Sequence, residues 1–144
     1  TVEFIEGFEI FHQKIRDHQI PSAIATNAHP KNLETLVQSM NFKKYFGSNI
    51  YCIADVDYKA KPDPAIFLHA AKQLGVLPSE CIIFEDSLPG FKAAKAAGMH
   101  CIAIKNDINS DLVHNATRSI TSYHDAEEAL KELIDADFYK KHVE

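Results

Sequence analysis

Short apolar runs alternate with amphipathic segments along this chain. Runs of strand length occupy residues 21–26, 50–54, 81–84, 100–104 and 119–122. Between them, apolar side chains recur at helical spacing, which predicts helices over residues 7–18, 30–40, 64–74, 89–97 and 125–138. Strands that alternate with helices are typical of a mostly parallel sheet covered on both faces. The pattern therefore predicts an α/β domain.

The composition is that of one ordinary globular domain. The 144 residues are 46% hydrophobic and 24% charged, and 15 Lys and Arg against 20 Asp and Glu give a net charge of −5. Without a basic block or an apolar run of membrane-spanning length, we expect neither nucleic-acid binding nor a membrane span. The odd set of cysteines lies in apolar runs, which favours reduced core residues in a cytoplasmic protein. These cysteines are Cys52, Cys81 and Cys101.

Ligands of open parallel sheets bind at the carboxyl ends of the strands. This rule directs attention to three places, which are Thr26, residues 54–61 and the pair Glu85 and Asp86. Thr26 and Asn27 follow an apolar run, and a hydroxyl beside exposed main-chain N–H groups can hold phosphate oxygens. Lys61 is projected by the stiff segment that Pro62 creates, so its ammonium could neutralise a carboxylate or a phosphoryl group. Taken singly, neither residue indicates a function, because a threonine at the end of a strand is common and a single loop lysine is ordinarily solvated.

Glu85 and Asp86 end the most apolar run of the chain. Adjacent side chains of a strand point to opposite faces, so one carboxylate could bind Mg²⁺ directly while the other acts through water. The alternative is that Asp86 and Ser87 only cap the following helix.

Together these features form an ordered set. The motifs follow one another as Thr26-Asn27, Lys61-Pro62-Asp63-Pro64 and Glu85-Asp86-Ser87. This order resembles the haloacid dehalogenase superfamily, most of all its branch of β-phosphoglucomutases and phosphoglycolate phosphatases. The resemblance covers residues 6–107 and is most specific over residues 84–99. It implies a three-layer, Rossmann-like core with a mostly parallel sheet.

The resemblance also implies a role for each matching residue. Thr26, with Asn27 beside it, would bind the transferring phosphoryl group, and Lys61 would stabilise its charge. Asp86 would be the direct Mg²⁺ ligand, with Glu85 as its acidic partner. The activity implied is that of a phosphatase or sugar phosphomutase working through an aspartyl-phosphate on a small phosphorylated metabolite such as a sugar phosphate.

The family's first motif, Asp-x-Asp-Gly-Thr/Val, does not occur before Thr26. Residues 1–20 instead resemble the helix that re-enters the core from the family's cap domain. We therefore expect residues 1–144 to form one partial core domain that lacks its first, central strand and the cap. Such a chain would be inactive alone and a piece of a longer polypeptide. Its unpaired strand edges would close up, be filled by another chain, or drive self-association.

Alternatives from other classes remain. A catalytically silent binding or assembly domain would also lack the nucleophile. Asp55-x-Asp57 imitates the missing motif, but Tyr58 and Lys59 follow it and it lies after Thr26, so we expect two loop residues. A phospho-acceptor receiver domain is disfavoured because receiver acids precede the lysine in sequence.

Overall fold

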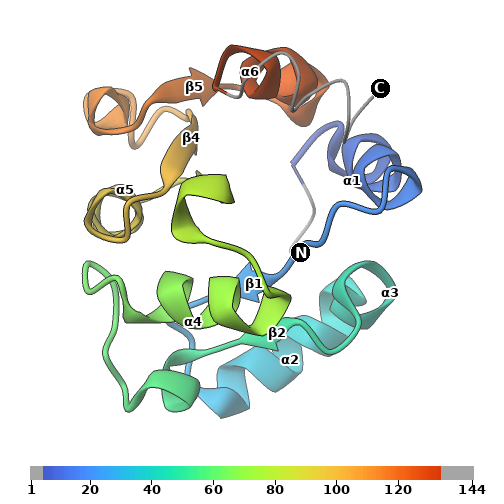
Figure 1. Ribbon diagram of the computed structural model, residues 1–144, viewed down its shortest axis with the longest axis vertical. Helices are drawn as coiled ribbons and strands as arrows, with labels where there is room; N and C mark the ends of the chain where they lie inside the picture. Colours follow the sequence, from blue (N-terminus) through green and yellow to red (C-terminus); the bar gives the residue numbers. More distant parts are fainter. Residues whose placement is uncertain (1–4, 134–144) are drawn as a thin grey trace.

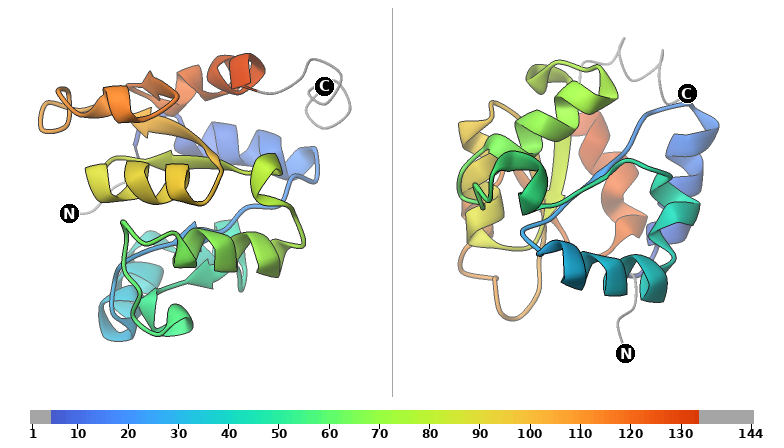
Figure 2. Two further views of the ribbon diagram at one scale, coloured as in Figure 1. Left: turned by 60° about the vertical axis from the view of Figure 1, so that its left-hand side comes forward. Right: turned by 90° about the horizontal axis from the view of Figure 1, so that it is seen from below.

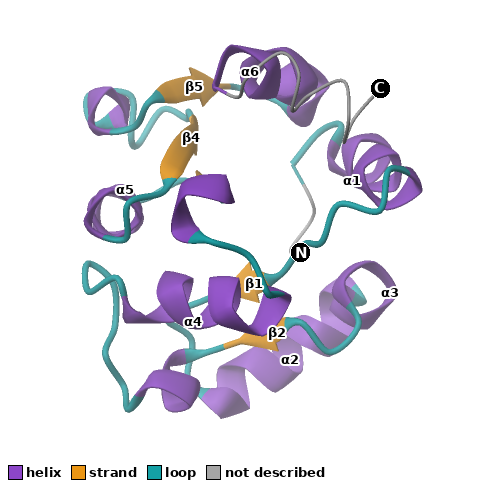
Figure 3. Cartoon of the chain, in the orientation of Figure 1, coloured by secondary structure: helices purple, strands orange, loops and turns teal. Residues whose placement is uncertain are grey.

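The computed structural model describes residues 5–133 and contains five short strands and six α-helices in that range (Figures 1 and 3). The strands are β1 (Ile24–Ala25), β2 (Ile50–Tyr51), β3 (Ile82–Glu85), β4 (His100–Ile104) and β5 (Arg118–Ile120). The helices are α1 (Phe8–Asp17), α2 (Pro30–Met40), α3 (Phe42–Phe46), α4 (Ala65–Leu74), α5 (Leu88–Ala96) and α6 (Ala126–Leu133).

All strand pairs are parallel, which confirms the expected α/β class, but they form two separate groups. β1 pairs with β2, and β3, β4 and β5 pair in that order. Within the described range, β1 and β3 are not paired with each other. One of the outcomes expected for the unpaired strand edges was that β1 and β3 close up on each other. The structure does not show this pairing among the described residues.

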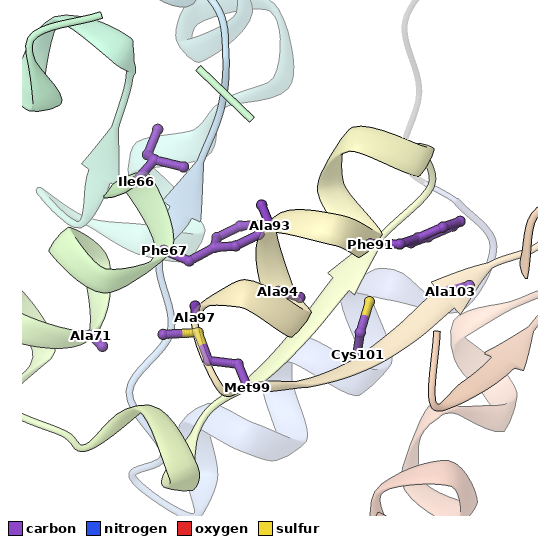
Figure 4. Close-up of a cluster of buried hydrophobic side chains, with 10 residues drawn as sticks. All are labelled: Ile66, Phe67, Ala71, Phe91, Ala93, Ala94, Ala97, Met99, Cys101 and Ala103. Atoms are coloured by element: carbon purple, nitrogen blue, oxygen red, sulfur yellow. The ribbon is translucent and has the colours of Figure 1, made fainter. Parts of the chain in front are cut away.

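Helices cover both faces of the larger sheet. Successive side chains of β4 point to opposite faces, so the strand buries side chains under both layers of helices. Cys101 and Ala103 are buried against α4 and α5, and Figure 4 shows this cluster. Ile102 and Ile104 are buried on the other face against α1 and α6. The fold thus has three layers, with α4 and α5 on one face of the sheet and α1 and α6 on the other (Figures 1 and 2).

Helix α1 lies beside the last described segments, far from it in sequence (Figures 1 and 2). Lys14 forms an ion pair with Glu127 of α6, and Tyr123 donates its main-chain N–H to the Glu6 carbonyl at 2.8 Å. The ring of Phe8 meets that of Tyr123 edge-on at 5.3 Å. These contacts fix the first helix on the outer face of the sheet.

The prediction of a strand over residues 50–54 was wrong at its end. β2 stops at Tyr51, and the 3-10 turn η1 (Ile53–Val56) follows. The turn forms because Asp55 Oδ2 accepts the main-chain N–H of Cys52 at 2.9 Å. Cys52 and Cys101 are buried as expected, whereas Cys81 precedes β3 and is only half-buried.

The ends of α4 are close to expectation. Pro64 caps the helix instead of starting it, and Asp63 Oδ1 accepts the Ala65 N–H at 2.8 Å. Gly75 closes it with φ +72°. The predicted last helix is present up to Leu133, and residues 134–138 lie outside the described range. No helix between residues 5 and 133 is long and apolar enough to cross a bilayer.

Candidate active site

Lys61 joins the carboxyl ends of the two sheet groups. Its Nζ donates to the carbonyl of Ala25, the last residue of β1, at 2.9 Å and to Glu85 Oε2, at the end of β3, at 2.8 Å. Both side chains of this ion pair are about one-tenth exposed. The ammonium also lies 4.8 Å from the centre of the Phe67 ring, which adds a cation–π contact. A buried positive charge is therefore held in the interval between β1 and β3.

Glu85 has its remaining oxygen occupied as well. Oε1 accepts the main-chain N–H of Asp86 at 3.0 Å and the Ser87 hydroxyl at 3.2 Å. Burial alone would raise the pKa of Glu85, but the charge and hydrogen bond of the Lys61 ammonium, together with hydrogen bonding from Asp86, outweigh it and hold the pKa below its usual value. Glu85 is thus a carboxylate fixed on three partners.

Space for this carboxylate comes from a glycine in the first turn of α5. A Cβ atom on Gly90 would stand 2.0 Å from Glu85 Cγ and 2.4 Å from Oε2. Ser87 caps the same turn by accepting the Gly90 N–H at 3.2 Å. The start of α5 is therefore shaped around Glu85.

Asp86 is exposed and lies next to that fixed carboxylate. Partial burial, together with the hydrogen bonding and negative charge of Glu85, raises the pKa of Asp86. A divalent cation would relieve this repulsion, and Mg²⁺ binds through one or two carboxylates while keeping waters or phosphate oxygens. No group of three His, Cys, Asp or Glu side chains that could hold a metal occurs among residues 5–133. Asp86, with Glu85 beside it, could thus supply only part of the ligands of a Mg²⁺ ion.

Asn27 and Thr26 lie at the same end of β1. Asn27 Oδ1 accepts the main-chain N–H of Lys61 at 2.9 Å, so the asparagine positions the lysine. Thr26 donates its N–H to Tyr51 at 3.0 Å, and its Oγ1 accepts the Ala28 N–H at 3.1 Å. The structure thus joins Asn27, Lys61 and Glu85 by direct hydrogen bonds, with Thr26 and Asp86 as their chain neighbours.

The Asp55-x-Asp57 sequence, which imitates the nucleophile motif, belongs to the turn that follows β2. Asp55 belongs to η1, and Asp57 ends that turn with a left-handed backbone at φ +54°. The expectation that both are loop residues is confirmed.

Sequence reasoning missed two residues that shape this site. Gly90 lies inside the stretch that carries the resemblance, but the reason for a glycine there becomes visible only with Glu85 against it. Asn109, in the segment after β4, is 3% exposed and donates to the Asp86 carbonyl at 2.8 Å. No local pattern marks an asparagine as buried when its partners come from distant segments.

Comparison with known proteins identifies the family. The model of the haloacid dehalogenase-like hydrolase family matches residues 6–98. The chain belongs to the haloacid dehalogenase-like hydrolases. The relatives of this HAD-like chain include the bifunctional riboflavin kinase/FMN phosphatase of Arabidopsis thaliana, 32% identical over 93% of this chain and 33% of that protein.

Solved structures agree on the fold. A HAD family hydrolase from Deinococcus radiodurans with bound phosphate and sodium has a TM-score of 0.80 and 30% identity, covering 90% of this chain and 59% of that one. CbbY from Rhodobacter sphaeroides, in complex with xylulose-(1,5)bisphosphate, has a TM-score of 0.72 and 28% identity over 83% and 54% of the two chains. The expected resemblance to the β-phosphoglucomutase branch is confirmed, since β-phosphoglucomutase-like and CbbY structures are among the neighbours. The HAD-like chain spans only part of each of these proteins.

Proposed function

We propose that this chain is the phosphoryl-binding part of a Mg²⁺-dependent phosphatase or sugar phosphomutase. The observation that carries the proposal is the Lys61 ammonium, which touches the carboxyl ends of both β1 and β3. A preorganised positive charge there would bind phosphate oxygens and stabilise the charge of the transfer step. The relatives support a small phosphorylated metabolite as substrate, since one is an FMN phosphatase and another was solved with a sugar bisphosphate.

Thr26, Asn27 and Lys61 would form the phosphate-binding side of the site. The Thr26 hydroxyl accepts a hydrogen bond from Ala28, which leaves its own hydrogen to donate to a phosphate oxygen. Asn27 acts by fixing the main chain of Lys61. The lysine side chain needs little reorganisation to act, because Glu85 already holds it in place.

Asp86 would hold Mg²⁺ directly, with Glu85 behind it. Glu85 is committed to Lys61 and to the Asp86 N–H, so its part is to orient the loop and to balance charge. When bound, the ion would neutralise charge on the phosphate oxygens. The exposed carboxylate of Asp86 is the group left available for this role.

We further propose that the nucleophilic aspartate lies outside these 144 residues, on a strand between β1 and β3 that belongs to a longer polypeptide with its own cap. Two observations support this: within residues 5–133 no strand pairs β1 with β3, and the relatives are longer than this chain. A carboxylate oxygen of that aspartate would attack phosphorus as the ester P–O bond breaks, and the second aspartate of the same motif would protonate the leaving oxygen so that the alcohol departs. Water would then hydrolyse the aspartyl-phosphate in a phosphatase, and a second sugar hydroxyl would take the phosphoryl group in a mutase. Residues 1–144 alone would be inactive.

A second candidate function is a catalytically silent binding or assembly domain. It is favoured by the edges of β1 and β3 that no strand within residues 5–133 pairs, through which the chain could pair with another chain or with itself. An Asp-x-Asp sequence ahead of this segment in the natural polypeptide would decide for catalysis. A cytoplasmic location stays a prediction under either function.

The test begins with the intact mass of the natural polypeptide, which should exceed that of this chain. Its Mg²⁺-dependent hydrolysis of p-nitrophenyl phosphate should then fall about ten- to a thousandfold in Lys61→Ala, because one electrostatic contact to the transition state is lost. Lys72→Ala, on the exposed side of α4, is the matched control and should keep full turnover. Full turnover in a folded Lys61→Ala variant would remove the basis of the proposal.

A further inference from the structure

Asn109 is a buried polar residue that the proposed chemistry does not use. It lies in the segment between β4 and β5, and only 3% of its surface is exposed. An amide side chain is costly to bury unless its donors and its acceptor are all paired. The contacts of Asn109 therefore indicate what it does.

The amide of Asn109 is fully paired by main-chain atoms. Nδ2 donates to the carbonyl of Asp86 and to the carbonyl of Ile104, each at 2.8 Å. Oδ1 accepts the main-chain N–H of Asn106 at 2.7 Å. These partners also fix which way the amide points, since the reverse orientation would place Oδ1 against two carbonyl oxygens.

The two carbonyls mark the carboxyl ends of β3 and β4. The last pair of the β3–β4 ladder is Glu85 with Ala103, and Asp86 and Ile104 are the next residues on each strand. The Asn109 side chain therefore ties the two strands together one step beyond their ladder. It does so at Asp86, which is an exposed residue.

Asp86 is consequently held from both sides of its main chain. Its N–H donates to Glu85 Oε1 at 3.0 Å, and its carbonyl accepts Asn109 Nδ2. With both groups fixed, the direction in which the Asp86 side chain leaves the backbone is restricted. Outer partners of this kind orient metal ligands, and their loss typically weakens metal binding by about ten- to a hundredfold.

We propose that Asn109 is the positioning residue that aims the Asp86 carboxylate at the metal and phosphate. This inference rests on the proposed function, in which Asp86 binds Mg²⁺. Asn109 itself touches neither ion nor substrate. It acts only through the Asp86 main chain, and its bond to Ile104 gives that loop a rigid support on β4.

The experiment is a calorimetric Mg²⁺ titration of the metal-free, full polypeptide that carries this chain. Asn109→Ala and Asn109→Ser should each bind Mg²⁺ about ten- to a hundredfold more weakly than the natural protein. Asn115→Ala is the matched control, because Asn115 Nδ2 also donates to a main-chain carbonyl, that of Leu112 at 2.9 Å. Asn115 is exposed, and the side-chain contacts that the structure gives it are to its sequence neighbours Leu112 and His114. Its Mg²⁺ affinity should not change.

A measurement on the unmodified polypeptide covers the case in which the Asn109 variants do not fold. On addition of Mg²⁺, the NMR signals of the Asn109 side-chain amide should shift and those of Asn115 should stay in place. Folded Asn109 variants with unchanged affinity, or an Asn109 amide that ignores the ion, would overturn the positioning role. Failure of the proposed function gives a different result, in which Asp86→Asn binds Mg²⁺ as tightly as the natural protein.

Discussion

The carboxylate of Glu85 occupies space that only a glycine at position 90 leaves open. Because an added Cβ would stand 2.0 Å from Glu85 Cγ, Gly90→Ala must push the carboxylate away from Lys61. We expect Gly90→Ala to lower the free energy of unfolding by about 1–3 kcal/mol, as overpacking does. Urea denaturation measures this change. The turnover of the natural polypeptide should fall as well, because Lys61 loses its Glu85 partner.

The control for Gly90→Ala is the same substitution in a Glu85→Ala background. Once the Glu85 side chain is gone, alanine should stabilise α5 by up to about 1 kcal/mol relative to glycine, since it is the better helix former. The effect of one substitution thus changes sign with its neighbour. An equal loss of stability in both backgrounds would show that crowding against Glu85 is not the cause.

His12 makes the stability of the chain depend on pH. It is 2% exposed among aromatic rings, its Nε2 meets Ser22 Oγ at 3.2 Å, and its Nδ1 has no hydrogen-bond partner within the described residues. Burial, and then the charge of Arg16, lowers its pKa. At a pH between the lowered pKa and the usual one, His12 is therefore protonated in the unfolded chain and neutral in the folded chain.

It follows that the free energy of unfolding should fall as pH drops below about 6.5, the usual pKa of histidine, until the pH passes the lowered value in the fold. Urea denaturation, from about one pH unit above the usual histidine pKa to about one and a half units below it, measures the slope of the free energy of unfolding against pH. His12→Gln should flatten it, whereas His100→Gln, at an exposed position of β4, should not. Identical slopes for the natural protein and His12→Gln would contradict the assignment.

Helix α5 contributes the centre of the core between the sheet and α4. Phe91 is fully buried in the cluster of Figure 4, so Phe91→Ala should lower the free energy of unfolding by about 3–5 kcal/mol. Lys92→Ala, at the next and exposed position, should change it by no more than about 0.5 kcal/mol. Denaturant titration compares the two. A loss below about 1 kcal/mol for Phe91→Ala would mean that α5 does not hold this core together.

The elements that could be predicted from sequence are those whose pattern is local. The apolar face of α4 and the Asp63, Pro64 and Gly75 signals at its ends placed that helix almost to the residue. β2 was predicted too long because Cys52 and Ile53 are apolar, and apolarity does not show that Asp55 folds back to take the Cys52 N–H. The short α3 was missed because five residues carry too little periodicity.

The same limit applies to the site. Strand ends in a parallel sheet converge, so the run of apolar strands was enough to gather Thr26, Lys61 and Glu85 at one edge. That Lys61 bonds to the Ala25 carbonyl, and that Asn109 bonds to Asp86, depends on tertiary contacts between segments 36 and 23 residues apart. Periodicity along one segment carries no information on such pairs.

The division of the sheet into two groups makes the proposed strand of a longer polypeptide testable. The Thr26 N–H donates to the Tyr51 carbonyl of β2, and the Ile24 N–H donates to the carbonyl of Asn49, the residue just before β2. By the alternation of a parallel ladder, the N–H of Ala25 therefore points to the side away from β2. The Ala25 carbonyl on that side is taken by Lys61. If a strand of a longer polypeptide lies between β1 and β3, the Ala25 N–H is one of the groups it would pair.

Amide hydrogen exchange at Ala25 therefore tests the arrangement directly. We expect the Ala25 amide to exchange slowly in the natural polypeptide and fast in residues 1–144 alone. The Ile24 and Thr26 amides, bonded to the carbonyls of Asn49 and Tyr51, should be protected in both. Ala25→Pro adds a second test, because proline removes this N–H and no bond of β1 to β2. It should destabilise the natural polypeptide and reduce self-association of the isolated chain, as sedimentation would show. Equally fast exchange of Ala25 in both proteins would mean that no strand enters between β1 and β3.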